Sequence, residues 1–189
     1  MWEVPTARSV RELAYRRVDR VILGEIERAR PRLRALRKEH PAAGRPELVD
    51  LLVEKKRSLA GTGGMISGSF GIAGVPLDIV MVTYLQISLA VEVALLHGVN
   101  LKSKTAQRDV LDVVARGNGV NTLYRGGAPL LARFALMLLR RRGWPSLGRV
   151  VPVLAMPVCA YLNSRDLTRV GIAAHRHYEG IALLAERRR

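Results

Sequence analysis

The feature that most constrains this chain is a central segment, residues 58–101, that contains no lysine or arginine although the 189 residues carry 31 of them. The only charged side chains in it are Asp78 and Glu92. A helix on the surface of a soluble protein shows a charge at nearly every turn, so a segment without charges is either buried in protein or faces lipid. The central segment therefore indicates a membrane or the middle of a helical core.

Positive charge is carried by the flanks of the central segment. The net charge is +6 for residues 1–57, −2 for the central segment, +8 for 102–149 and +3 for 150–189, which gives +15. Basic residues near an anionic leaflet each contribute about 1 kcal/mol to binding. Nucleic acid would also attract them, but the chain has no recognisable docking motif and few aromatic residues for stacking, so we do not expect nucleic acid as a partner.

Helical periodicity dominates the sequence, and no run alternates with period two for long enough to form a sheet. We therefore predict an all-α fold. A proline inside a helical pattern ends or kinks the helix, whereas a proline at the first helical position is favourable. The helices expected outside the central segment run from about Val10 to Pro31 with a short continuation to His40, from Pro46 to Arg57, from Thr105 to Arg116, from Pro129 to Arg142, and from Pro157 towards the C-terminus.

Within the central segment the sequence predicts a glycine-rich helical hairpin that turns at Pro76 and forms the centre of a helical bundle. Gly64 and Gly68 have the spacing that lets two helices approach closely in lipid. Each limb of about 18 residues would be roughly 27 Å long, close to the hydrocarbon thickness of a bilayer. The residues expected to pack the hairpin are Gly61, Gly64, Gly68, Gly71, Gly74 and Pro76.

Basic clusters at both ends of the hairpin place both ends on the cytoplasmic side of a membrane. Glu92 supports the alternative, a buried helix pair in a soluble bundle, because an ionised group in a lipid-facing helix costs about 2.5 to 3.5 kcal/mol. Both alternatives stay open. The residues predicted to face the membrane surface are Lys55, Lys56 and Arg57 before the hairpin, and Lys102, Lys104 and Arg108 after it.

The domain organisation predicted from these patterns has three parts: a basic amphipathic arm with a linker (1–44), a helical domain (45–178) and a basic tail (179–189). The N-terminus is charged and has no apolar stretch before a cleavage site, so we do not expect secretion. Cys159 is the only cysteine, which excludes an internal disulfide and a cysteine-based metal cage. We expect no metal and no cofactor.

The acids of the central segment are the first candidates for catalysis. Asp78 and Glu92 are 14 residues apart, about 21 Å along one helix, so they cannot act as one acid-base pair. Each would need a partner such as Gln86, Asn163 or His97. We interpret Asp78 as a helix cap after Pro76, and Asn163 as a buried residue that hydrogen-bonds between helices. Glu92, within an apolar helix, should be paired or protonated.

Two histidines near the C-terminus are the other obvious candidates. His175 and His177 lie two positions apart, which turns them about 200° from each other on a helix. They are therefore poor joint ligands for one metal ion, and we interpret them as surface residues.

Two separated motifs resemble the EcsC family. The first comprises Gly61-Thr-Gly-Gly-Met, Gly74-Val-Pro76-Leu-Asp78, Gln86 and Glu92-Val-Ala94-Leu-Leu-His97-Gly98; the second comprises Val151-Pro152-Val153, Asn163 and Val170-Gly171-Ile-Ala173. Ala155 and Cys159 stand where that family would have small glycines. The resemblance covers roughly residues 46–178. It implies a helical, often membrane-associated bacterial protein, in some genomes a companion of an ABC transporter, and it implies no established reaction.

The sequence thus favours a non-enzymatic protein of the cytoplasmic face of a bacterial membrane, which binds anionic lipid or a membrane protein. The rival hypothesis is a hydrolase or other enzyme that acts on a lipid or another amphiphile through Glu92, Asp78 and Asn163. The stripe of the N-terminal arm is poor in aromatics, and residues 1–57 contain nine acidic residues. We therefore expect the arm to pack mainly on protein, either its own domain or another subunit of a homo-oligomer.

Overall fold

The structure, a computed structural model, describes the backbone of residues 7–69, 75–119 and 152–187 and the side chains of residues 20–63, 80–119 and 160–187. Every regular element in these ranges is an α-helix, which confirms the all-α fold class. The helices are α1 (Ala7–Glu39), α2 (Arg45–Ser69), α3 (Val75–Leu96), α4 (Lys104–Gly117) and α6 (Pro152–Glu186).

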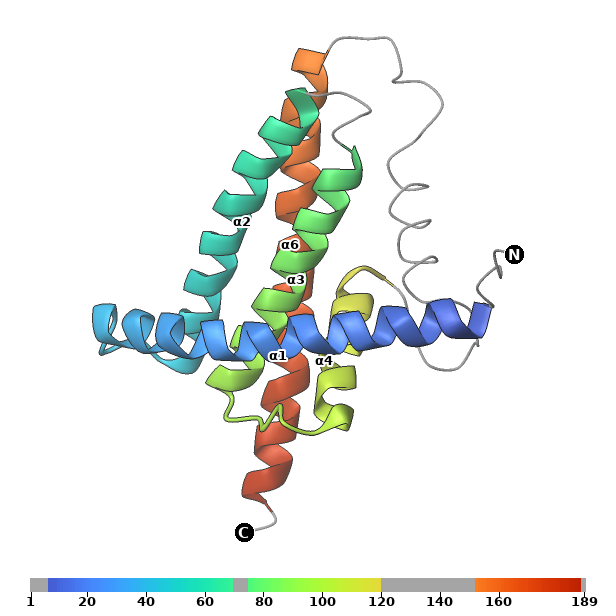
Figure 1. Ribbon diagram of the computed structural model, residues 1–189. Helices are drawn as coiled ribbons and strands as arrows, with labels where there is room; N and C mark the ends of the chain where they lie inside the picture. The colour runs from blue at the N-terminus through green and yellow to red at the C-terminus, as the bar shows by residue number, and fades with distance from the viewer. Residues whose placement is uncertain (1–6, 70–74, 120–151, 188–189) are drawn as a thin grey trace.

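Helices α2, α3 and α6 run beside one another and form the body of the fold (Figure 1). Helix α1 lies across α3, and the short helix α4 packs against α6 and α3. One hydrophobic core joins all five helices, because buried side chains from each of them belong to the same cluster.

Helix α1 continues through Pro31, so the predicted break at this residue is wrong. A proline inside a helix costs about 3 kcal/mol, and burial of the residues on both sides of it offsets that cost here. Pro31 lies on the exposed side of the helix, whereas Ala29 and Leu33 are buried. The buried stripe of α1 runs from Ile22 to Leu36 and packs on the protein, as the shortage of aromatic residues led us to expect.

Helix α3 occupies the middle of the fold. Every side chain from Leu85 to Ala94 is buried, on all sides of the helix. Protein packing therefore explains the lack of lysine and arginine in this part of the central segment, and lipid is not needed for it. The helix ends at Leu96 and the chain turns at Gly98 with a φ of 75°, a backbone conformation that glycine adopts readily.

Close approach between helices depends on two glycines. Gly171 of α6 faces the side chain of Val53 on α2, and Gly117 at the end of α4 lies against the backbone of Val170 on α6. The final helix begins at Pro152, five residues before the predicted start at Pro157. A proline is favourable at the first position of a helix because its missing N–H would have no helical partner there.

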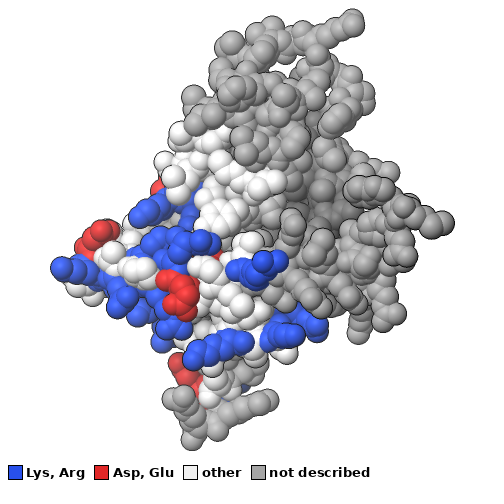
Figure 2. Space-filling model, viewed as in Figure 1, with Lys and Arg blue, Asp and Glu red and all other residues white. Residues whose placement is uncertain are grey.

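Charged side chains are unevenly distributed over the visible surface. In Figure 2 lysine and arginine side chains gather over the middle and lower part of the described surface, and the uppermost part of the described surface is uncharged. In the described ranges, no helix combines the length and the apolar character needed to cross a membrane.

Substituting Gly117 by alanine should lower the stability of the fold. A Cβ atom at this position would come within 2.6 Å of the Val170 Cα atom, so α4 and α6 would have to separate. We expect a loss of about 1 to 3 kcal/mol in the free energy of unfolding, measured with urea. Gly180→Ala is the matched control, because no atom lies within 4 Å of its Cβ position. The control should gain about 0.5 to 1 kcal/mol from helix propensity; equal effects would contradict this packing.

Candidate functional site

The most concentrated polar chemistry in the described structure surrounds Glu92, whose side chain is 1 % exposed. Its carboxylate accepts a hydrogen bond from Arg32 Nε of α1 at 2.7 Å. The other carboxylate oxygen lies 3.2 Å from Lys56 Nζ of α2. Glu92 itself belongs to α3, so one buried acid connects three helices. Of the two states expected for Glu92, paired or protonated, the structure shows the paired arrangement.

A second buried acid, Glu25 of α1, extends this arrangement. Tyr84 and Ser88 of α3 each donate a hydrogen bond to Glu25 at 2.6 Å, and Arg32 bridges Glu25 and Glu92. The spacing explains the convergence: Glu25 and Arg32 are two turns apart on α1, and Tyr84, Ser88 and Glu92 follow one another at every fourth residue of α3. We call this set the buried polar network; it comprises Glu25, Arg32, Lys56, Tyr84, Ser88 and Glu92.

Electrostatics within the buried polar network favour the ionised form of Glu25. Burial alone would raise the pKa of Glu25, because it penalises the charged form. Hydrogen bonds from Ser88, Tyr84 and Arg32 outweigh burial and lower that pKa to about 2. Burial lowers the pKa of Lys56, and the neighbouring Glu92 carboxylate offsets burial only in part. Two acids and two bases make the network neutral when all four are charged.

One contact in the network has the form of a nucleophile and its base. Lys56 Nζ donates a hydrogen bond to Ser88 Oγ at 2.5 Å. However, the Ser88 side chain is completely buried and its own proton is donated to Glu25. A substrate could reach this hydroxyl only if α1 left α3. The arrangement therefore holds helices together and is not poised for nucleophilic attack.

The structure does not bring the two predicted catalytic acids, Asp78 and Glu92, together. Asp78 lies in the first turn of α3, 14 residues before Glu92 in the same continuous helix, so the two acids are about 21 Å apart along its axis. The side chain of Asp78 lies outside the described residues. Asn163 is fully buried on α6, in agreement with its interpretation as a buried polar residue.

Gln86 and His97, which we considered as partners for Asp78 and Glu92, form contacts with other residues. Gln86 and Asn118 exchange amide hydrogen bonds of 3.4 and 3.0 Å. His97 contacts His175. The partners of Glu92 come instead from α1 and α2.

The glycines expected to pack the hairpin are only partly described. Gly61 faces the hydroxyl of Ser164 on α6, so it packs α2 on α6 and not on the other limb of the hairpin. Gly63, which we did not single out, faces the side chain of Met81 on α3. Gly64 and Gly68 lie in α2 and Pro76 is the second residue of α3, but their surroundings are outside the described residues, as are Gly71 and Gly74 altogether.

The prediction of a basic membrane surface is wrong for one of its six residues, Lys56. Lys56 is buried, with 8 % of its side chain exposed, and it pairs with Glu92. The sequence signal was misleading because charge clusters do not reveal which member faces inwards. Arg57 is half-exposed and pairs with Glu54 at 3.0 Å. The remaining members, Lys55, Lys102, Lys104 and Arg108, are exposed.

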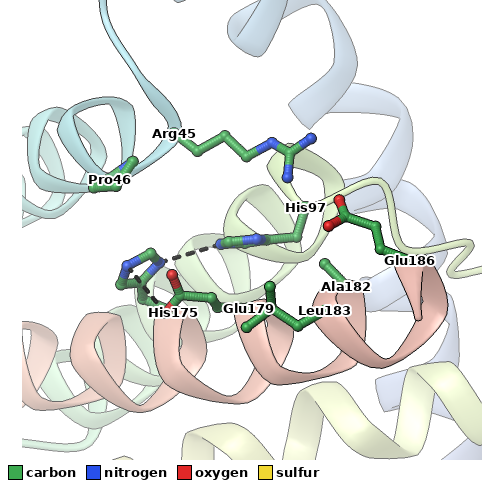
Figure 3. A pocket seen from close by; sticks show the side chains of 8 residues that line it. All are labelled: Arg45, Pro46, His97, His175, Glu179, Ala182, Leu183 and Glu186. Atoms are coloured by element: carbon green, nitrogen blue, oxygen red, sulfur yellow. Dashed lines mark hydrogen bonds and ion pairs between the residues drawn. The ribbon is translucent and has the colours of Figure 1, made fainter.

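A small pocket of about 170 Å³ lies near the other end of the fold (Figure 3). In it His97 Nε2 and His175 Nδ1 are 3.2 Å apart, and His175 Nε2 lies 3.8 Å from a carboxylate oxygen of Glu179. Burial lowers the pKa of His97, and the charges of His175 and Arg45 lower it further. His175 is therefore not the free surface residue that the sequence predicted.

This pocket contains few metal ligands in a suitable arrangement. Across the described ranges, no three side chains of His, Cys, Asp or Glu converge as a metal site. His177 points away from the pocket and stacks edge-on against Tyr178, with ring centroids 5.0 Å apart. The two histidines of α6 thus serve different neighbours, as their spacing predicted.

The sequence contained a signal for the residues that we missed. Glu25 lies three residues after Ile22 and four before Ala29, so it interrupts the apolar stripe of α1 at a position that must face the core. An acid in such a position requires a buried partner. Arg32, two turns further on, has the spacing of that partner.

Comparison with known proteins gives no further assignment: no protein-family model, curated protein or solved structure matches this chain.

Replacing Glu92 by glutamine should destabilise the protein strongly, because it leaves the Lys56 ammonium buried without its countercharge. We expect a loss of about 3 to 5 kcal/mol in the free energy of unfolding. Glu54→Gln is the matched control; its exposed pair with Arg57 should be worth less than about 1 kcal/mol. The double variant Lys56→Met/Glu92→Leu should recover most of the loss. A Glu92→Gln protein as stable as the parent would contradict the pairing.

Acid should remove the contribution of Glu25 in a defined window. Its pKa is 4.5 in the unfolded chain and about 2 in the folded protein, so its stabilising effect is complete above pH 4.5 and is lost as the pH falls towards 2. Between pH 5 and 2 the free energy of unfolding of the parent should therefore fall more steeply with decreasing pH than that of Glu25→Gln. The control Glu27→Gln, at an exposed position of the same helix, should keep the parental slope.

Proposed function

We propose that this protein is a membrane-associated helical protein of the cytoplasmic face, which binds lipid or a membrane-protein partner and does not catalyse a reaction. The glycine-rich C-terminal end of α2 and the first turns of α3 form its membrane-contacting element, a hairpin around which the other helices pack.

The observation that carries this proposal is an uncharged region that protein burial does not account for. Leu59 of α2 and Val80 of α3 are 52 % and 67 % exposed, within the part of the chain that has no lysine or arginine. The C-terminal half of α3 lacks lysine and arginine because it is buried, but Leu59 and Val80 are exposed. Exposed apolar side chains in a charge-free region are typical of surfaces that contact lipid or another protein.

The basic residues beside this region support an anionic target. Helix α1 presents Arg28, Arg34 and Lys38 on its exposed side while its apolar side is occupied by α3. Arginine and lysine near an anionic leaflet gain roughly 1 kcal/mol each, and the gain decreases with salt.

The resemblance to the EcsC family supports the same direction, because members of that family are often membrane-associated and some accompany ABC transporters. A transporter subunit is therefore the partner that we would test first. The rival enzymatic hypothesis depended on Glu92 as an acid or base. A carboxylate that is 1 % exposed and held between Arg32 and Lys56 is unsuited to that role, so we do not propose catalysis.

Cell fractionation tests the proposal directly. We expect the full chain to sediment with the membranes, because its apolar and basic surfaces both favour the bilayer. An alkaline carbonate wash then separates two modes of attachment: release indicates a peripheral protein, and retention an embedded one. Recovery of all the protein as a soluble monomer without detergent would contradict the proposal.

A further inference from the structure

At one end of the bundle α2, α3 and α6 carry almost no charged residues, and this end begins at the level of Arg57 and Ser164. The Ser164 hydroxyl of α6 donates a hydrogen bond to the Arg57 carbonyl of α2 at 3.4 Å, so these two residues lie at the same height in the bundle. Gly63 of α2 faces Met81 of α3, which brings the first turns of α3 to the same side of that level. We call residues 58–69, 75–81 and 152–163 the apolar tip.

The apolar tip contains far fewer charged residues than the level of Arg57 and Ser164 at which it begins. Its three segments contain a single charged residue, Asp78. This residue lies in the first turn of α3. At the level itself Lys55 and Arg165 are exposed and Arg57 is half-exposed. We call these three residues the basic belt.

Each helix of the apolar tip exposes a large apolar or aromatic side chain. Leu59, Val80 and Tyr161 are 52 %, 67 % and 64 % exposed on α2, α3 and α6. Tyr161 lies one turn from the basic belt, a position that suits the headgroup level where tyrosine is enriched in membrane proteins. Surfaces of this kind, rimmed by cations, are complementary to a bilayer with apolar tails and anionic headgroups.

The length of the apolar tip sets its depth. Its segments on α2 and α6 each contain 12 residues, which corresponds to about 18 Å of helix at 1.5 Å per residue. Half of a hydrocarbon core that is about 30 Å thick is roughly 15 Å. The tip is therefore long enough for one leaflet and too short for the bilayer.

Helix α1 limits the depth further. Its Arg32 is tied to Glu92 at the height of Lys56, next to the basic belt, and α1 lies across the bundle there (Figure 1). Its exposed arginines and lysines would meet phosphate groups at the point where the apolar tip ends.

We propose that the apolar tip inserts into a single leaflet of an anionic bilayer and stops at the basic belt, with α1 lying at the headgroups. This inference rests on the membrane association proposed above and adds its orientation, depth and lipid charge. The opposite end of α6, with exposed Leu183 and Leu184 among charged residues, stays in water.

Paired substitutions at the two ends of the molecule test the orientation. The full chain is mixed with phosphatidylcholine vesicles containing about one third phosphatidylglycerol, and bound protein is measured by co-sedimentation. Leu59→Asp and Val80→Asp should each lower the partition coefficient by at least about tenfold, since a charge in the hydrocarbon is costly. Leu183→Asp and Leu184→Asp, at equally exposed positions, should change it less than twofold. All four side chains are solvent-exposed, and unchanged melting temperatures would exclude misfolding.

Depth is tested with a fluorophore attached to Val80→Cys or Leu184→Cys in a Cys159→Ser background. Quenchers in the acyl chains should quench the label at position 80 and leave the label at 184 unaffected. A water-soluble quencher trapped inside the vesicles should reach neither; quenching of position 80 from the lumen would show a span and overturn the one-leaflet depth.

The remaining outcomes separate the two proposals. If the parent binds no vesicles and fractionates as a soluble protein, membrane association itself fails. If the parent binds but the four aspartate variants bind equally well, or neutral vesicles bind as tightly as anionic ones, the orientation or the lipid charge is wrong. If the tip variants instead dissociate a dimer in lipid-free solution, a second copy occupies the tip and the inference is overturned.

Discussion

The Glu92 carboxyl group, buried between Arg32 and Lys56, is the constraint on which the rest of the structure depends. A buried charge is tolerated only when it is paired and hydrogen-bonded, and here the two partners come from two other helices. The acid therefore fixes how α1 crosses α3 and where α2 lies beside it. Replacing Glu92 and its partners with apolar residues of similar size should cost little stability. We therefore expect the contact between Glu92 and Arg32 to contribute mainly by fixing the position of α1 on the bundle.

The central segment lacks lysine and arginine for two different reasons, which the sequence could not separate. From Leu85 to Ala94 the segment lacks lysine and arginine because neighbouring helices surround it. Around Leu59 and Val80 the same lack of charge occurs at exposed positions. The buried part agrees with a helix inside a bundle, and for the exposed part contact with lipid is our proposal. A lack of charged residues indicates that a segment avoids water, but it does not show whether the segment contacts protein or lipid.

The elements were more predictable from the sequence than their contacts. The starts and ends marked by Pro46 and by His97 and Gly98 were correct because these residues act through their own backbone geometry. Pro31 failed as a helix stop because burial of Ala29 and Leu33 outweighs a local preference. Glu92 could be predicted to be paired, but Lys56 was assigned to the surface and Glu25 and Arg32 were missed, since pairing across 60 residues depends on how helices pack.

The buried polar network also decides how a basic amphipathic helix can engage a membrane. A free helix such as α1 would bury its apolar stripe in the headgroup region. Here that stripe lies on α3, and lifting it away would leave Glu92 without Arg32 and Ser88 without Glu25. Breaking a buried pair in this way costs about 3 to 5 kcal/mol, comparable with the gain from three to five basic residues at an anionic leaflet. Helix α1 should therefore remain docked and meet lipid with its charged side only, which leaves insertion to the ends of α2, α3 and α6.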